Sequence, residues 1–166
     1  GNSGTCGRLI LGLLIASKKK IKLKGDKSLS SRDFSRVTSP LERFGAKFFP
    51  LKRKNLPISI LGSNFTRPIN YLENIGSAQC KSSIMLAALN TPGKTLIKAK
   101  KSRNHTELLF KSLKIPIKIK KEKKYDLIQV KGLHQYNCFD YIVPGDISSS
   151  AFFIVLTLLS KNSELI

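Results

Sequence analysis

The sequence has no tryptophan, one methionine, two histidines and three cysteines among its 166 residues. Because Cys6, Cys80 and Cys138 are odd in number and far apart, they match neither a disulfide framework nor a zinc-binding spacing. The histidines, His105 and His134, have no second ligand at a spacing that would hold a metal ion. We therefore expect no metal and no cofactor, and a reducing compartment: the cytoplasm, or a plastid if the source is a plant.

Long apolar runs and acidic residues are also scarce. The longest nearly unbroken apolar runs, residues 9–16 and 151–159, are well short of the roughly 20 residues that span a bilayer. Ten Asp plus Glu against thirty Lys plus Arg give a formal net charge of +20, while 41% of the residues are hydrophobic. That apolar content is too high for a disordered basic tail, so we expect a folded, strongly basic protein without a membrane span.

The positive charge comes mainly from lysine. Lysine runs at 18–20 and 120–124 would suit nucleic acid, but proteins that read base sequence favour arginine, and single-strand binders interleave aromatic residues. Lysines instead alternate with isoleucine and leucine at 20–24 and 115–120, which is the period of a half-exposed strand. A lysine-rich outer surface of sheets is the favoured interpretation. Attraction of small anionic substrates and nucleic-acid binding stay as alternatives.

Apolar periodicity and turn residues predict helices and strands along the whole chain. We expect helices at 5–16, 33–44, 78–89, 105–113 and 148–159. We expect strands at 19–24, 57–61, 68–72, 95–100, 115–120, 126–130 and near 139–143, with an extended stretch at 47–51. Pro40 lies inside the second helix, so one continuous helix and a short turn followed by a helix after Ser39 both fit.

The order helix, strand, helix, strand, strand occurs twice, and a further strand precedes it only in the second copy. Such repetition predicts an α/β (α+β) protein built from βαβαββ units that are each too small to bury their own apolar face. Residues 1–143 would form most of one lobe, with the first of two units cut at its start and a third unit missing. After the break at Pro144-Gly145-Asp146, residues 144–166 would form the crossover and the first helix of a second lobe.

Several predicted helix starts carry hydroxyl side chains and arginines. Free N–H groups at a helix start attract anions, and a guanidinium strengthens that attraction. A serine or threonine there is more often a simple cap, which explains Ser77 but not the neighbouring Gln79. The helix starts concerned carry residues 1–5 with Arg8, Arg32, Ser77-Ala78-Gln79, and Ser102-Arg103. They suit a ligand that is rich in phosphate and carboxylate groups.

Five stretches of the chain form a series that can be compared with known families. They are Gly1-Asn2-Ser3-Gly4-Thr5 with Arg8, Gly25-Asp26-Lys27-Ser28-Leu29 with Arg32, Ser77-Ala78-Gln79-Cys80-Lys81-Ser82, Ser102-Arg103-Asn104-His105-Thr106-Glu107, and Val143-Pro144-Gly145-Asp146-Ile147-Ser148-Ser149. In this order they resemble motifs of the 5-enolpyruvylshikimate-3-phosphate synthase family, the 3-phosphoshikimate 1-carboxyvinyltransferases. The resemblance runs the whole length, but the family's enzymes are much longer, so we expect a central fragment that lacks both ends.

The resemblance implies a fold and roles for individual residues. The fold is an enolpyruvyl transferase-type inside-out α/β barrel, incomplete here, in which two lobes of three βαβαββ units close over the substrates. The residues that would bind phosphoenolpyruvate are Gly4, Arg32 and Gln79. Those that would bind shikimate-3-phosphate are Ser77, Ala78, Gln79, Ser102 and Arg103, with Arg103 on its phosphate.

Other residues receive supporting or altered roles from the same resemblance. Asn2 and Thr5 would shape the first turn, and Lys81 would be structural. The chain has Arg32-Asp33-Phe34 where many relatives have Arg-Pro-Met, and Arg103-Asn104-His105 where they have Arg-Asp-His. The family's N-terminal lysine and its C-terminal Asp, Glu and Arg residues lie outside this chain. We therefore expect no catalytic residue within it and no turnover by it alone.

The implied reaction transfers the enolpyruvyl (1-carboxyvinyl) group of phosphoenolpyruvate to the 5-hydroxyl of shikimate-3-phosphate and releases phosphate, on the route to chorismate and the aromatic amino acids. The partners would be these two small molecules, with no nucleic acid and no membrane, and the complete enzyme would be a monomer. One alternative is UDP-N-acetylglucosamine 1-carboxyvinyltransferase, which uses a mobile-loop cysteine, whereas Cys80 falls in a predicted helix. The other is a basic nucleic-acid-binding module.

Overall fold

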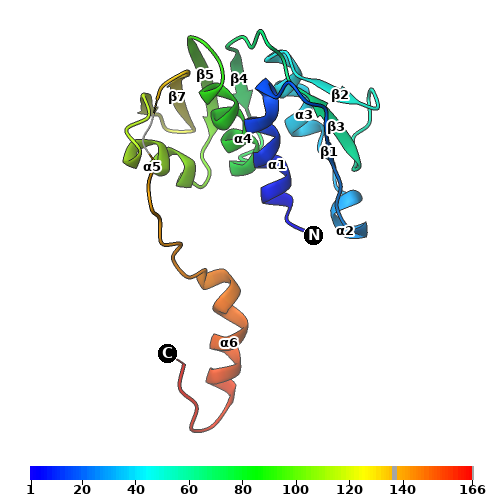
Figure 1. Ribbon diagram of the computed structural model, residues 1–166. Helices are drawn as coiled ribbons and strands as arrows, with labels where there is room; N and C mark the ends of the chain where they lie inside the picture. Colours follow the sequence, from blue (N-terminus) through cyan, green and yellow to red (C-terminus); the bar gives the residue numbers. More distant parts are fainter. Residues whose placement is uncertain (136–137, 166) are drawn as a thin grey trace. The chain divides into compact units, whose positions relative to one another are not determined.

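The computed structural model describes residues 1–135 and 138–165, which form two compact segments, Gly1–Tyr136 and Asn137–Ile166 (Figure 1). The helices of the first segment are α1 (Gly4–Leu13), α2 (Lys27–Ser30), α3 (Ser35–Arg43), α4 (Ala78–Leu89) and α5 (His105–Ser112), with a 3-10 turn η1 (Leu14–Ala16) after α1. Its strands are β1 (Ile21–Leu23), β2 (Lys47–Phe49), β3 (Ile58–Leu61), β4 (Asn70–Glu73), β5 (Lys94–Lys100), β6 (Ile117–Lys121) and β7 (Tyr125–Lys131). The second segment contains α6 (Ile147–Leu159).

The strands form two sheets with matching topology. The first sheet has the order β1-β3-β2 and is antiparallel throughout. The second has the order β4-β5-β7-β6, in which β4 is parallel to β5 and the other pairs are antiparallel. Without β4 the two orders correspond strand for strand, and in the described residues no strand precedes α1. The repeated element order expected from the sequence is therefore present; we call α1 to β3 the first repeat and β4 to β7 the second repeat.

Helices α1 and α4 join the two repeats. They run in the same direction, since Thr5 contacts Gln79 near both helix starts and the Leu13 carbonyl accepts from Asn90 near both ends. Gly12 allows this close approach, because a Cβ atom there would overlap the carbonyl oxygen of Ser83. This packing brings the N-termini of α1 and α4 to the same end of the segment.

The alternating lysines lie on the outer faces of the sheets. In β5 the side chains of Thr95, Ile97 and Ala99 are buried, and those of Lys94, Leu96, Lys98 and Lys100 are exposed. In β6, Ile117 and Ile119 are half-buried, and Lys118 and Lys120 are exposed. The structure confirms that these lysines form a solvated surface, whose apolar inner side packs on the helices.

Some expected elements differ from the observed ones. The short helix α2 was not expected; the Asp26 carboxylate caps it by accepting from the Leu29 backbone N–H at 2.8 Å. Helix α3 runs through Pro40 without a break but begins only at Ser35, because the Asp33 carboxylate accepts from the Ser35 N–H at 2.6 Å. The strand expected near 139–143 is wrong: those residues are mostly apolar but form no ladder hydrogen bonds in the described chain.

The second segment consists of an irregular stretch and α6. The Asp146 carboxylate caps this helix, accepting from the Ser148 N–H at 3.0 Å and the Ser149 hydroxyl at 2.7 Å. These hydrogen bonds, that from the Ser149 hydroxyl first, lower the pKa of Asp146. No described residue of α6 is buried, and Phe152 is 82% exposed. Of the helices in residues 1–135 and 138–165, none is long and apolar enough to cross a membrane.

Candidate functional site

Two adjoining hollows lie where the N-termini of α1 and α4 meet. The first has a volume of about 330 Å³ and is lined by Arg8, Arg32, Asp33, Arg36, Ser77, Gln79 and Cys80. The second has a volume of about 430 Å³ and is lined by Gly76, Ser77, Ala78, Gln79, Ser102 and Arg103. Ser77 and Gln79 belong to both, so the two hollows share one wall.

The first hollow is strongly cationic. A Cβ atom at Gly4 would lie 2.9 Å from Nη1 of Arg8 and 2.9 Å from Nη1 of Arg32. Only glycine therefore leaves room for both guanidinium groups at the start of α1. Arg36 adds a third guanidinium from α3. Among the described residues, none of the three arginines forms an ion pair with a carboxylate. Their charges and the N-terminus of α1 favour an anion in this hollow.

Asp33 is the acidic residue of the first hollow. Hydrogen bonds from Ser35, supported by the charges of Lys54 and Arg36, hold the pKa of Asp33 below its usual value. Its carboxylate is therefore ionised at neutral pH and is occupied by the N-terminus of α3. It moderates the positive charge of the hollow without neutralising any of the guanidinium groups directly.

Gln79, in the second repeat, is held in place by two residues of the first repeat. Its Nε2 donates to the Thr5 hydroxyl at 2.7 Å, and its Oε1 accepts from Arg8 Nη1 at 2.9 Å. Arg8 is itself fixed, because its Nη2 donates to the Asp33 carbonyl at 3.1 Å and its guanidinium lies 5.0 Å from the centre of the Phe34 ring. The Gln79 amide keeps one further N–H and one lone pair for a ligand in either hollow.

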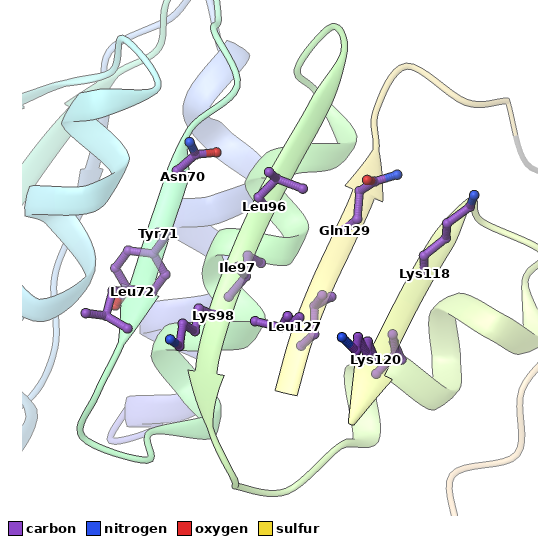
Figure 2. Close-up of a pocket in the computed structure, with 12 residues that line it drawn as sticks. Asn70, Tyr71, Leu72, Leu96, Ile97, Lys98, Lys118, Lys120, Leu127 and Gln129 are labelled. Atoms are coloured by element: carbon purple, nitrogen blue, oxygen red, sulfur yellow. The ribbon is translucent and has the colours of Figure 1, made fainter. Parts of the chain in front are cut away.

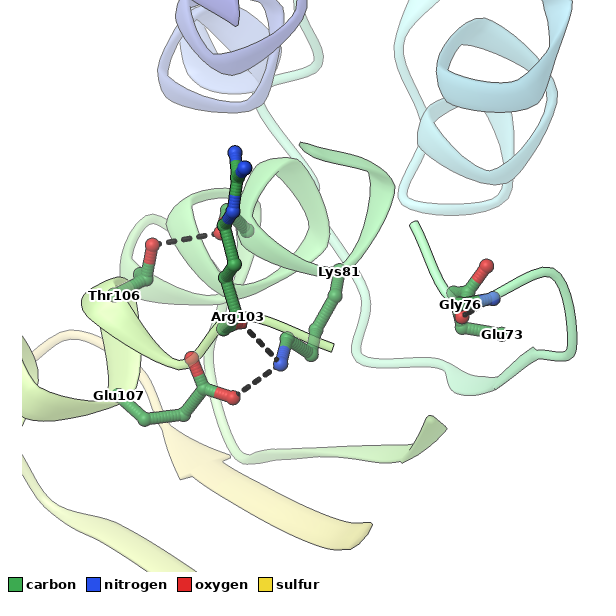
Figure 3. Close-up of polar contacts among 7 residues, drawn as sticks. Glu73, Gly76, Lys81, Arg103, Thr106 and Glu107 are labelled. Carbon is green, nitrogen blue, oxygen red and sulfur yellow. Dashed lines mark hydrogen bonds and ion pairs between the residues drawn. The ribbon is translucent and has the colours of Figure 1, made fainter. Parts of the chain in front are cut away.

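The turn before α4 is shaped by a buried carboxylate. Glu73 is 2% exposed and accepts from the backbone N–H groups of Ile75, at 3.1 Å, and Gly76, at 2.8 Å (Figure 3). Gly76 has a φ of +81°, which favours glycine. Ser77 then caps α4 by accepting from the Cys80 N–H at 3.2 Å. The start of α4 is thus rigidly presented to both hollows.

The opposite wall of the second hollow is the loop before α5. The hydroxyl oxygen of Ser102 is buried and has no hydrogen-bond partner in the part of the chain that the structure describes. A buried polar atom beside a hollow is a natural contact for a bound polar group. Arg103 comes from the same loop, and its backbone carbonyl accepts from Lys81 Nζ at 2.9 Å (Figure 3).

A larger hollow of about 600 Å³ covers the outer face of the second sheet (Figure 2). Its floor is formed by neighbouring residues of the four strands, such as the row Leu72, Lys98, Leu127 and Lys120. It lies on an open sheet surface and includes no helix start and none of the residues expected to bind substrate. We place the functional site at the two smaller hollows, where the polar groups converge.

The structure brings all the expected binding residues together. Gly4, Arg32 and Gln79 border the first hollow, and the set expected for shikimate-3-phosphate lines the second. Arg36 and Gly76 were missed by the sequence analysis. Arg36 lies in the first turn of α3, only four positions after Arg32, and this nearness in sequence was the available signal. No three His, Cys, Asp or Glu side chains gather to hold a metal ion within the described residues.

Known proteins match the chain over its whole length. The profile of the family described as EPSP synthase (3-phosphoshikimate 1-carboxyvinyltransferase) matches residues 1–166. The 3-phosphoshikimate 1-carboxyvinyltransferase of Caldicellulosiruptor saccharolyticus is 43% identical over 168 residues, which cover 100% of this chain and 39% of that protein. That of Zymomonas mobilis is 36% identical, with 100% and 37% covered.

A solved structure agrees with these sequence matches. The EPSP synthase of Acinetobacter baumannii superimposes with a TM-score of 0.79 at 36% identity, covering 95% of this chain and 35% of that one. The present chain therefore spans less than two fifths of the length of the relatives it matches. Its paired repeats have the enolpyruvyl transferase-type fold in incomplete form. With the profile, the relatives and the fold in agreement, the chain belongs to the EPSP synthase family.

Proposed function

We propose that this chain supplies one wall of the active site of a 3-phosphoshikimate 1-carboxyvinyltransferase, which transfers the enolpyruvyl group of phosphoenolpyruvate to shikimate-3-phosphate. The observation that carries the proposal is the pair of hollows that share Ser77 and Gln79. Two substrates that react with each other need adjoining sites, and both of these substrates are anions. The family membership of the chain supports the same assignment.

The first hollow is the proposed site of phosphoenolpyruvate. Gly4, Arg32 and Gln79 would contact it, with Arg8 fixing the Gln79 amide. Phosphoenolpyruvate carries a carboxylate and a phosphate, and guanidinium groups bind both through paired, charge-assisted hydrogen bonds. The absence of a paired carboxylate on these arginines among the described residues supports this role.

The second hollow is the proposed site of shikimate-3-phosphate. Ser77, Ala78 and Gln79 would contact it from α4, and Ser102 and Arg103 from the loop before α5. The buried Ser102 hydroxyl without a partner in the described chain supports a contact with a polar substrate group. Arg103 would bind the 3-phosphate, and Gln79 would touch both substrates from the shared wall.

In the proposed reaction the 5-hydroxyl of shikimate-3-phosphate loses its proton as its oxygen bonds to C2 of phosphoenolpyruvate, and a proton adds to the methylene carbon C3. Loss of a proton from C3 and cleavage of the bond to the phosphate oxygen then give the enol ether and free phosphate. We assign none of these three proton transfers to a residue of this chain. Its residues would hold two anions side by side, offset their repulsion and orient the hydroxyl toward C2.

We also propose that residues 1–143 form most of one lobe and that residues 144–166 lead into the other. The apolar surface of α6 supports this division, because a helix that is apolar on all sides needs cover from other parts of a protein.

Replacing the matching segment of the Acinetobacter baumannii synthase with these 166 residues tests the proposed function. A chimera that catalyses the reaction is expected, and a folded chimera that binds both substrates without turnover would argue against it.

Substrate binding to the 166-residue chain itself is the more direct test. Titration with shikimate-3-phosphate, followed by NMR, should shift the backbone signals of Ser77, Gln79 and Ser102. Arg103→Ala should weaken this binding, whereas Lys118→Ala, which removes the same charge from the outer sheet face, should not. Equal losses in the two variants would show that only the net charge attracts the ligand, and the proposed site would be wrong.

A further inference from the structure

Beside the second hollow, two oppositely charged side chains are buried together. Lys81 of α4 and Glu107 of α5 are in contact at 2.6 Å between Nζ and Oε1, and their side chains are 1% and 4% exposed (Figure 3). The other ion pair of the described residues, Lys120–Glu122, lies on the surface at 3.7 Å. Lys81–Glu107 is therefore a specific internal feature and is not part of the lysine-rich surface.

The position of the Lys81 ammonium relates the pair to the proposed substrate site. Besides contacting Glu107, it donates to the Arg103 carbonyl at 2.9 Å. Of the hydrogen bonds in the described residues, this is the one that connects Ser102 or Arg103 to α4. Since α4 carries one wall of the second hollow and this loop carries the other, Lys81 joins the two walls.

The loop has little else to hold it. Asn104, at the N-cap position of α5, forms no capping hydrogen bond with its side chain. The Thr106 hydroxyl donates to the Ser82 hydroxyl at 2.7 Å, but this bond joins α5 to α4 beyond the loop. The backbone at Arg103 thus depends on Lys81 for its place.

Stability alone does not explain a buried pair of this kind. Removing two charges from water costs about as much as their attraction returns, and apolar pairs of similar volume are often as stable or more so. The pair is also not fully satisfied, because Glu107 Oε2 is buried without a hydrogen-bond partner in the described chain. What an apolar pair could not supply is the directed hydrogen bond to Arg103.

We propose that Lys81 and Glu107 are positioning residues for the shikimate-3-phosphate site: Lys81 holds the loop that presents Ser102 and Arg103, and Glu107 holds the Lys81 ammonium in the place from which it reaches that loop. The inference rests on the proposed function, because it concerns the same hollow. Neither residue touches the substrate. Loss of the pair leaves α4 in place but lets the opposite wall move, so the second hollow loses affinity and the first does not.

The decisive variant is Lys81→Met/Glu107→Met, which replaces both charges with apolar side chains of similar length. We expect it to unfold at nearly the same urea concentration as the unsubstituted chain. We expect its Kd for shikimate-3-phosphate to rise about tenfold, the effect of one well-placed hydrogen bond. The Kd for phosphoenolpyruvate should change less than about twofold, because Gly4 and Arg32 belong to the other hollow.

Two matched variants separate positioning from general stability. Thr106→Val removes the neighbouring bond between the same two helices and should lower stability without changing the Kd for shikimate-3-phosphate. Glu107→Gln keeps an acceptor for Lys81 and should bind this substrate within about threefold of the unsubstituted chain. If the methionine variant does not fold, Lys81→Gln/Glu107→Gln serves in its place, because glutamine is too short to reach the Arg103 carbonyl.

Hydrogen exchange of the Leu108 backbone amide, which donates to the carbonyl of Asn104 beside Arg103 at 3.0 Å, provides a readout that needs no substrate. We expect exchange at least about tenfold faster in the methionine variant and unchanged in Thr106→Val. A folded methionine variant with unaltered exchange, or with unaltered shikimate-3-phosphate affinity, overturns the proposal, as does an equal loss for both substrates. If the unsubstituted chain binds neither substrate, the proposed function is wrong, and the exchange rates still decide whether Lys81 holds the loop.

Discussion

In the first repeat, Arg32 precedes α3 and its guanidinium lies against Gly4, whereas in the second repeat Arg103 precedes α5 and its backbone is held by Lys81. The two arginines stand at equivalent places in one topology. The first repeat adds two more guanidinium groups, while the second adds hydroxyl groups and a buried ion pair. Duplication of a fold can therefore provide two anion sites, and the residues around each helix start then decide which anion each site prefers.

The comparison of the two repeats presupposes that they pack tightly on each other. Of the substitutions proposed here, Gly12→Val should disturb this packing most. A side chain at this position overlaps the Ser83 carbonyl, so α1 and α4 must separate. Overpacking of this kind costs about 3 kcal/mol of unfolding free energy. Both hollows should lose their ligands together, because Gln79 would no longer reach Thr5. Urea unfolding and titration with each substrate measure the two effects.

Gly7→Ala is the matched control in the same helix. An added Cβ atom would lie 3.5 Å from the Phe34 ring, an ordinary contact distance. Because alanine favours the helix over glycine by about 1 kcal/mol, this variant should be as stable as the unsubstituted chain or more so. Equal stability of Gly12→Val and Gly7→Ala would show that the helices do not pack as closely as described.

The next largest effect should be a loss of substrate affinity that differs between variants of the two arginines. Loss of a charge-assisted hydrogen bond costs about 1.5–3 kcal/mol, or roughly tenfold to a hundredfold in affinity. We expect Arg32→Ala to weaken the binding of phosphoenolpyruvate and Arg103→Ala to weaken the binding of shikimate-3-phosphate. Lysine should restore only part of either loss, because it lacks the planar fork.

Titration of both substrates into both arginine variants measures this difference, and the apparent KM values of the chimeric synthase provide a second readout. The two repeats are functionally distinct only if each variant affects one substrate much more than the other. If both variants weaken the binding of both substrates to the same degree, the two hollows act as one common anion site.

Local sequence signals predicted much of what makes this comparison possible. Helix α4 begins and ends where expected, at 78 and 89, because Ser77 caps it and the apolar pattern is long. The repeat was visible because element order needs only local periodicity. The strand expected near 139–143 failed for the complementary reason: a short run rich in apolar residues does not form a strand without a partner strand.

The parts of the site that the sequence did not reveal depend on contacts between distant residues. Lys81 and Glu107 are 26 positions apart, and only the packing of α4 on α5 buries them together. Arg8 was noted as a residue near a helix start, but its contact with Gln79 crosses 71 positions and joins the two repeats. Motif resemblance indicated which residues are expected to bind substrate, and the fold shows which contacts hold them in place.

A smaller effect is expected at Gly4, the residue that sets the first hollow apart. The Cβ atom of Gly4→Ala would meet the flexible ends of Arg8 and Arg32 at 2.9 Å, so the guanidinium groups can shift instead of the backbone. We expect the Kd of phosphoenolpyruvate to rise about fivefold and that of shikimate-3-phosphate to stay within about twofold. The temperature of thermal unfolding should be unchanged or slightly raised, since alanine favours the helix. An equal rise in the Kd of both substrates in Gly4→Ala would contradict the assignment of one substrate to each hollow.

The smallest effect concerns Asp33, the carboxylate that the second hollow lacks. Hydrogen bonds from Ser35 lower its pKa in the folded chain, so the unfolded chain takes up its proton at a higher pH than the folded chain does. The stabilisation is therefore complete above the unfolded pKa of about 4, and it is lost as the pH falls through the lower folded pKa. Because the side chain is largely exposed, solvent screening limits the contribution to about 0.3 kcal/mol.

Asp33→Asn removes the charge but keeps an oxygen for the Ser35 N–H. Its unfolding free energy in urea should be slightly below that of the unsubstituted chain at pH 7, and the difference should shrink as the pH falls through the lowered folded pKa, because Asp33 then becomes protonated in both states. At pH 7 the same variant should bind phosphoenolpyruvate slightly more tightly, since one negative charge has left the first hollow, while shikimate-3-phosphate binding stays constant. A stability difference that stays constant as the pH is lowered from 7 through the acid range would assign the effect to the shape of the side chain. In that case the charge of Asp33 would not be part of what distinguishes the two repeats.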